Sequence, residues 1–280
     1  MLAVLLALGS ALAWGVADFL GGMNTRRYAL LGVIAVSQVA GFVVVGAVVV
    51  GTTTGPPDRR YVLFAVLAGV AGAVGITALY RGLAVGAMSI VAPITATGAM
   101  IPVGVGIAAG ERPSWIQGVG LALALSGVVL ASRDWRSGHA HRAPIAAGVG
   151  LALLGALGIG GFLAALDAAS EGGVLWTLLV QRLTMIALVV SPALFLGSRL
   201  ALPRGALPIV AAIGLLDVGA NALFAEASTR GLVSVVAVIA SLYPVATVIL
   251  ARLVLSERIG RVQQAGVGGA LAGVALITAG

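Results

Sequence analysis

The sequence predicts an all-α integral membrane protein of about ten transmembrane helices, arranged as two inverted five-helix repeats. The composition is too apolar for a surface that faces water, and long apolar runs follow one another through all 280 residues. In addition, the two halves of the chain resemble each other, which divides the runs into two sets of five.

The composition indicates that lipid is the main solvent of this chain. Hydrophobic residues make up 60% of it and charged residues only 9%, whereas soluble domains carry about 25% charged residues. The net charge of +7 comes from arginines that lie mostly between apolar runs, so we attribute it to membrane topology and expect no nucleic-acid partner. The chain contains no Cys, which excludes disulfides and thiol chemistry. We expect no metal and no cofactor.

Ten apolar runs are each long enough to cross a bilayer core of about 30 Å at about 1.5 Å per residue. Short segments that carry Arg, Pro, Gly or Asn separate them. The longest polar segment, residues 133–143, lies near the midpoint of the chain. The predicted spans are 2–22, 29–51, 61–80, 86–109, 115–132, 144–166, 174–197, 206–226, 231–252 and 260–279.

An internal repeat relates the first five spans to the last five. A shift of 143 positions aligns Gln38 with Gln181, and a shift of 146 aligns Glu111 with Glu257. The matches keep their order across five spans, so we predict a first repeat at 1–132 and a second at 144–280, joined by a linker at 133–143. Because five is an odd number, the second repeat enters the membrane in the opposite orientation, as in many secondary transporters.

Several motifs recur at the ends and in the middle of these spans. They are Trp14-Gly15 with Phe19, Gly-Glu-Arg at 110–112, Gln-Gly-x-Gly from Gln117, Tyr243-Pro244 and Ser-Glu-Arg at 256–258. In these motifs the chain resembles the drug/metabolite transporter superfamily, specifically its ten-helix EamA-type members. The resemblance implies a transporter of small metabolites, such as amino acids, sugars or amphiphiles. It also implies a cavity lined mainly by the first, third, fourth, sixth, eighth and ninth spans.

Three ionisable residues lie well inside predicted spans, where a charge is costly and usually faces the bundle interior or an aqueous cavity. Asp217 lies near the middle of its span and could bind a proton, a cation or a substrate amine. Arg182 could hold a substrate carboxylate or neutralise an Asp; alternatively, an Asp–Arg pair ties two helices together. Asp18 lies toward the end of the first span, where it could also be merely solvated.

Six further residues complete the predicted substrate- or ion-binding set. Asn221 shares a helix face with Asp217, four residues away. Two glutamines in equivalent positions of the repeats could line the cavity or form an interhelical hydrogen bond. Two tyrosines could offer ring faces to an aromatic or cationic solute. The six residues are Trp14, Gln38, Tyr80, Gln181, Asn221 and Tyr243.

Other features predict structural or gating roles. Glu111 and Glu257 each precede a predicted helix, where a carboxylate favours the positive end of the helix dipole. We expect helix breaks around Pro93, Pro102 and Pro244 that help to gate the cavity. The connections with odd numbers hold eleven arginines and those with even numbers four, a bias that places both termini outside the cell.

Together these features predict a secondary transporter in the bacterial cytoplasmic membrane. Our hypothesis is an exporter of amino acids or amphiphilic compounds, with Asp217 as the proton-coupling group, acting as a monomer or homodimer among membrane lipids. The alternatives are a lipid-modifying membrane enzyme and a passive facilitator or uptake carrier for sugars. An enzyme would need clustered carboxylates, a nucleophile with a base or an interfacial His. The acids inside the spans lie singly on different helices, so we do not expect an enzyme.

Overall fold

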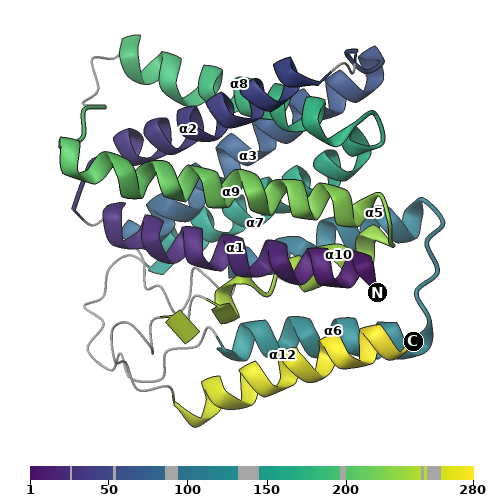
Figure 1. Ribbon diagram of the computed structural model, residues 1–280. Helices are drawn as coiled ribbons and strands as arrows, with labels where there is room; N and C mark the ends of the chain where they lie inside the picture. The colour runs from purple at the N-terminus through teal and green to yellow at the C-terminus, as the bar shows by residue number, and fades with distance from the viewer. Residues whose placement is uncertain are drawn as a thin grey trace.

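The computed structural model describes residues 1–25, 27–52, 55–85, 94–131, 145–195, 200–246, 249–250 and 260–280. These ranges are built from helices and contain no strand, which confirms the all-α class (Figure 1). The predicted linker 133–143, Pro93 and Glu257 lie outside them. The helices are α1 (Leu2–Thr25), α2 (Leu30–Gly51), α3 (Arg59–Val85), η1 (Thr97–Ala99), α5 (Met100–Ala108), α6 (Trp115–Ala131), α7 (Ile145–Ser170), α8 (Val174–Phe195), η2 (Arg204–Ala206), α9 (Leu207–Ser228), α10 (Val233–Ala240) and α12 (Arg261–Ala279).

Six of the described helices, α1, α2, α3, α7, α8 and α9, are long and apolar enough to cross a membrane. Shorter apolar helices of 10–17 residues lie at Ile94–Ala108, Trp115–Leu130, Val233–Ala246 and Gln264–Ile277. Each of the shorter helices falls within one of the other predicted spans. The helices therefore lie where the sequence placed them, and the number that crosses the membrane stays a prediction.

The contacts between helices are duplicated. In order along the chain, α1, α2 and α3 of the first repeat correspond to α7, α8 and α9 of the second. The contact between α3 and α7 corresponds to that between α9 and α1. The contact between α3 and α8 likewise corresponds to that between α9 and α2. Each of the remaining large contacts joins a helix to its own counterpart: α2 to α8, α5 to α10 and α6 to α12. Exchanging the two halves therefore reproduces the contact pattern, so the repeat found in the sequence is also a repeat in space.

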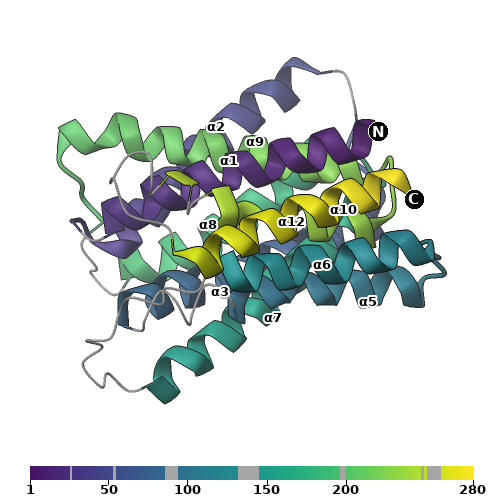
Figure 2. The ribbon, with the colours of Figure 1, turned by 90° about the horizontal axis from the view of Figure 1, so that it is seen from below.

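Counterpart helices run in opposite directions. Along the contact between α6 and α12, Gly120 lies against Gly273 and Gly127 lies against Ala270, so residue numbers rise on one helix as they fall on the other. α2 crosses α8 in the same antiparallel sense. Figure 2 shows α6 and α12 side by side along one face of the bundle. The second repeat is therefore turned over relative to the first.

Glycines allow the tightest of these contacts. A Cβ built on Gly158 of α7 would lie 2.5 Å from the Cα of Gly75 on α3, closer than real Cβ contacts come. Only glycine at both positions lets these two backbones touch. Gly269 and Gly273 of α12 likewise both face α6.

Two helices that approach the centre of the bundle are interrupted. α10 ends at Ala240, and the chain becomes helical again at Tyr243 after a two-residue turn. In the first repeat, the 3-10 turn at Thr97–Ala99 precedes α5 at the equivalent place. Both interruptions lie close to prolines around which we predicted a break: Pro244 is the second helical residue after the turn, and Pro102 lies in the first turn of α5. A proline is tolerated there because that turn's N–H groups have no partner within the helix.

Candidate functional site

A cavity of about 100 Å³ lies between the two repeats. Its wall is formed by α1, α2, α3, α7, α8 and α9 and by the segments around the two interruptions. The family resemblance did not imply that α2 and α8, the second and seventh predicted spans, line the cavity, but both contribute to its wall. Of the nine predicted site residues all but Arg182 line this cavity: Trp14, Asp18, Gln38, Tyr80, Gln181, Asp217, Asn221 and Tyr243.

Arg182 is fully buried behind the wall, where it holds a polar cluster together. Its Nη2 donates to Oδ2 of Asp217 at 2.5 Å, and its Nη1 donates to Oε1 of Gln38. On the cavity side, Nε1 of Trp14 donates to Oδ1 of Asp217 at 3.2 Å and to Oδ1 of Asn221 at 3.1 Å. The cluster joins α1 and α2 of one repeat to α8 and α9 of the other.

The pairing of Asp217 distinguishes two interpretations that the sequence left open. Arg182 neutralises the Asp217 carboxylate and has both terminal nitrogens engaged. The Asp–Arg pair of the second interpretation is therefore present, and both terminal nitrogens of Arg182 are engaged by protein groups. Asp217 remains 29% exposed on its cavity side.

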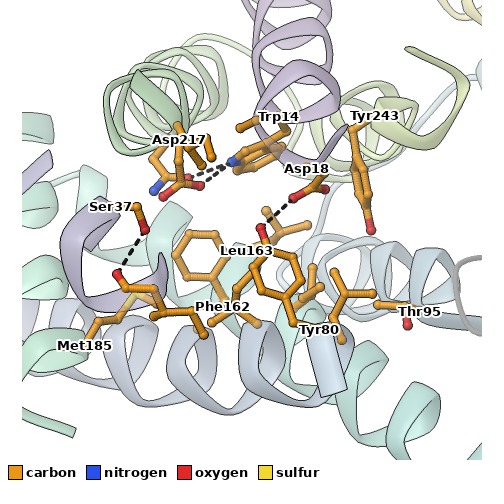
Figure 3. A pocket seen from close by; sticks show the side chains of 18 of the residues that line it. Trp14, Asp18, Ser37, Tyr80, Thr95, Phe162, Leu163, Met185, Asp217 and Tyr243 are labelled. Carbon is orange, nitrogen blue, oxygen red and sulfur yellow. Dashed lines mark hydrogen bonds between the residues drawn. The ribbon is translucent and has the colours of Figure 1, made fainter. Parts of the chain in front are cut away.

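Asp18 is the second carboxylate of the cavity. Its Oδ1 accepts a hydrogen bond of 3.4 Å from the hydroxyl group of Tyr80, on α3 (Figure 3). No basic side chain forms an ion pair with it in the described part of the chain. Because Asp18 lines the cavity, the interpretation that it is merely solvated at the membrane surface does not hold.

Aromatic rings surround the two carboxylates. The ring of Trp14 lies 6.0 Å from that of Phe224 and 6.5 Å from that of Tyr243, the latter edge to face. Tyr80 and Phe162 contribute further aromatic surface (Figure 3). Most of the remaining wall is aliphatic. The cavity therefore combines an apolar, aromatic lining with a few polar groups, the usual composition of a small-molecule site.

Some lining residues were not identified from the sequence. Ser37, Phe162 and Met185 all face the cavity. Phe162 could have been identified from the sequence, because the repeat aligns it with Phe19 of the first motif. Met185 could not have been identified, since the sequence does not show whether a methionine in an apolar span faces a cavity or the lipid. Gln181 also lines the cavity, and its buried Oε1 has no hydrogen-bond partner in the described residues.

Glu111 occupies a different place from the one predicted. Its carboxylate accepts hydrogen bonds from the backbone N–H groups of Val233 and Ser234, the latter at 3.0 Å, at the start of α10 in the other repeat. The start of α6 is capped instead by Ser114 and Gln117, which exchange bonds of 2.9 and 3.2 Å in a capping box. Glu111 therefore caps a helix, as we expected. The helix that it caps is not the next one in the chain, however, but one that begins 122 residues away.

The conformation of the backbone at the end of α5 places Glu111 at that position. Gly110 has a φ of +102°, and the N–H of Glu111 bonds back to the carbonyl of Gly106 at 2.9 Å, which ends α5. Gly106 also leaves the space that the carboxylate fills, because a Cβ there would overlap Oε2 of Glu111. The Gly-Glu motif therefore ties the two repeats together near the start of α10.

Comparisons with known proteins agree with this architecture. The model of the EamA-like transporter family matches residues 1–133 and 146–279. No curated protein matches the sequence. A crystal structure described only as that of a protein has 17% sequence identity and a TM-score of 0.81, over 99% of this chain and 96% of its own. At that identity the likeness shows a shared fold alone. Because the family match covers both halves, this multi-pass membrane protein belongs to the EamA-like transporter family.

Proposed function

We propose that this protein is a secondary transporter that exports small amphiphilic solutes or amino acids across the bacterial cytoplasmic membrane, driven by protons. The observation that supports it most is the cavity between two antiparallel repeats, which holds the carboxylate of Asp18 without a basic partner among the described residues. Inverted-repeat transporters bind their substrate at the interface between the repeats, and the rocking of one repeat against the other exposes it to each side.

The proton-binding group in this proposal is Asp18. The sequence favoured Asp217, but Arg182 neutralises that carboxylate at 2.5 Å, so a proton on Asp217 would have to displace an ion pair. A proton on Asp18 would displace only a hydrogen bond from Tyr80. A carboxylate that can be charged in one state and neutral in another gives the cavity a means of coupling to a pH gradient.

The test is flux from proteoliposomes loaded with a mixed pool of metabolites, with and without a pH gradient. We expect selective loss of one solute class that the gradient accelerates about tenfold in the native protein. Asp18→Asn should remove that acceleration, because the amide cannot take up a proton. Asp58→Asn, at an exposed position before α3, is the matched control and should behave as the native protein.

The other outcomes decide among the alternatives. Flux that is equal with and without a gradient in every preparation would indicate a passive facilitator. Retention of every solute by the native protein would contradict transport of anything in the pool, and would favour a test for lipid modification. Loss of gradient dependence in Asp58→Asn as well would show that the effect does not arise in the cavity.

A further inference from the structure

We propose that the preferred substrate of this cavity is an aromatic amine without a carboxylate, that is, a monovalent organic cation attached to an aromatic ring. The inference rests on the proposed function and narrows it, since that function leaves amino acids and other amphiphiles open. It is carried by the arrangement of charge in the cavity wall.

Within the described residues, the cavity wall contains one carboxyl group that no basic side chain compensates. Asp217 is neutralised by Arg182, whereas Asp18 faces the cavity with only the hydroxyl group of Tyr80 as a partner in the described part of the chain. A buried carboxylate is costly unless an opposite charge lies beside it. An ammonium group bound at Asp18 would supply that charge and could keep hydrogen bonds to neighbouring oxygens.

Among the described residues, the same wall offers a substrate carboxylate no cationic side chain, only neutral donors such as the amides of Gln38 and Asn221. Arg182 is fully buried, does not line the cavity, and donates both terminal nitrogens to protein groups. The buried Oε1 of Gln181, which lacks a partner in the described residues, is an acceptor and would repel a second anion. An α-amino acid could place its ammonium at Asp18, but its carboxylate would then have no charged partner among the described residues of the wall. A site that cannot pair a polar group discriminates strongly against the ligand that carries it.

The walls around Asp18 favour an aromatic substituent on the amine. Tyr80 donates its hydroxyl hydrogen to the carboxylate, and Trp14 and Tyr243 meet edge to face near it, with Phe162 across the cavity (Figure 3). Aromatic rings attract a cation through their faces and pack against another ring with their edges. The volume of about 100 Å³ is many times that of a single water site, about 10–15 Å³, and is suited to a ring with a short chain.

Three probes that differ only in their charged groups test this inference: phenethylamine, phenylalanine and 3-phenylpropionate. Binding is measured on the purified native protein by calorimetry, and flux is measured in proteoliposomes. We expect phenethylamine to bind and cross at least about tenfold better than phenylalanine, and 3-phenylpropionate to do neither. Asp18→Asn should weaken phenethylamine binding by at least about tenfold, whereas Asp58→Asn should not change it.

Each outcome bears on one of the two proposals. If phenylalanine binds and crosses as well as phenethylamine, the amine inference is overturned while the transport proposal stands. If none of the three probes binds but the mixed pool shows gradient-driven flux, the substrate class is likewise wrong. If neither the probes nor the pool moves, both proposals fail. Should Asp18→Asn not fold, as judged by its elution and thermal unfolding, the amine-to-amino-acid ratio of the native protein still decides.

Discussion

At the scale of single residues, the position of the polar groups followed from the sequence, but their pairing did not. A charge within an apolar span predicts an interior location whatever its partner is, and Asp18, Arg182 and Asp217 all lie at or behind one cavity wall. Which carboxylate meets the guanidinium depends on how α8 and α9 are rotated about their axes. Because these helices are apolar on nearly every side, their periodicity does not define that rotation.

The Arg182–Asp217 pair leads to a prediction about stability. Asp217→Ala would leave a fully buried guanidinium without its charged partner, and we expect it to lower the free energy of unfolding by about 3 kcal/mol. Combining it with Arg182→Met, which removes the orphaned charge, should cost less than Asp217→Ala alone. The measurement is unfolding of the purified variants by denaturing detergent, followed by circular dichroism.

The double variant is the decisive one. If its destabilisation equals the sum of the two single effects, the residues act independently and the structural role assigned to Arg182 is wrong. Asp58→Asn again serves as a control, since this exposed acid forms no ion pair in the described part of the chain.

At the scale of helices, the sequence located the elements well and their termini less well. The sequence Ser114-x-x-Gln117 could have been recognised as the cap of α6, because it matches a capping box. In this motif each side chain accepts a hydrogen bond from the other residue's backbone N–H. Glu111, four residues before α6, appeared to serve the same helix. Its actual partner, the start of α10, is distant in sequence and becomes adjacent only when α5 packs on α10.

The Glu111 cap should therefore stabilise contact between the repeats. In Glu111→Gln the amide keeps its shape but loses the charge that faces two backbone N–H groups and a helix N-terminus. We expect a loss of about 1–2 kcal/mol, measured as a lower midpoint of thermal unfolding in detergent.

Glu226→Gln is the matched control for this change. Glu226 pairs with Arg230 one turn away on an exposed surface, where an ion pair contributes about 0.5 kcal/mol or less. Equal midpoints for the two variants would mean that the bond from Glu111 to α10 contributes no more than a solvated surface pair.

At the scale of the whole molecule, the repeat was the most informative feature of the sequence. Matching residues at a nearly constant offset fixed both the number of units and, because each unit has five spans, their relative orientation. The antiparallel crossings of α2 with α8 and of α6 with α12 have that geometry. The cavity could not be predicted in the same way, since its walls come from both repeats and from two helix interruptions whose exact extent the nearby prolines did not define.

The orientation in the membrane provides the last prediction. Gly55 lies in the connection between α2 and α3, and Gly205 lies in the equivalent connection between α8 and α9; nothing lies within 4 Å of the Cβ that either would gain. The chain has no Cys, so Gly55→Cys and Gly205→Cys each introduce a single reactive thiol. An inverted repeat places these two positions on opposite sides of the membrane, and the arginine bias puts residue 205 on the cytoplasmic side. A membrane-impermeant maleimide added to intact cells should therefore label Gly55→Cys, and should label Gly205→Cys only after permeabilisation. The reverse pattern would preserve the inverted repeat and overturn the arginine-based orientation, whereas labelling of both from one side would contradict the inversion itself.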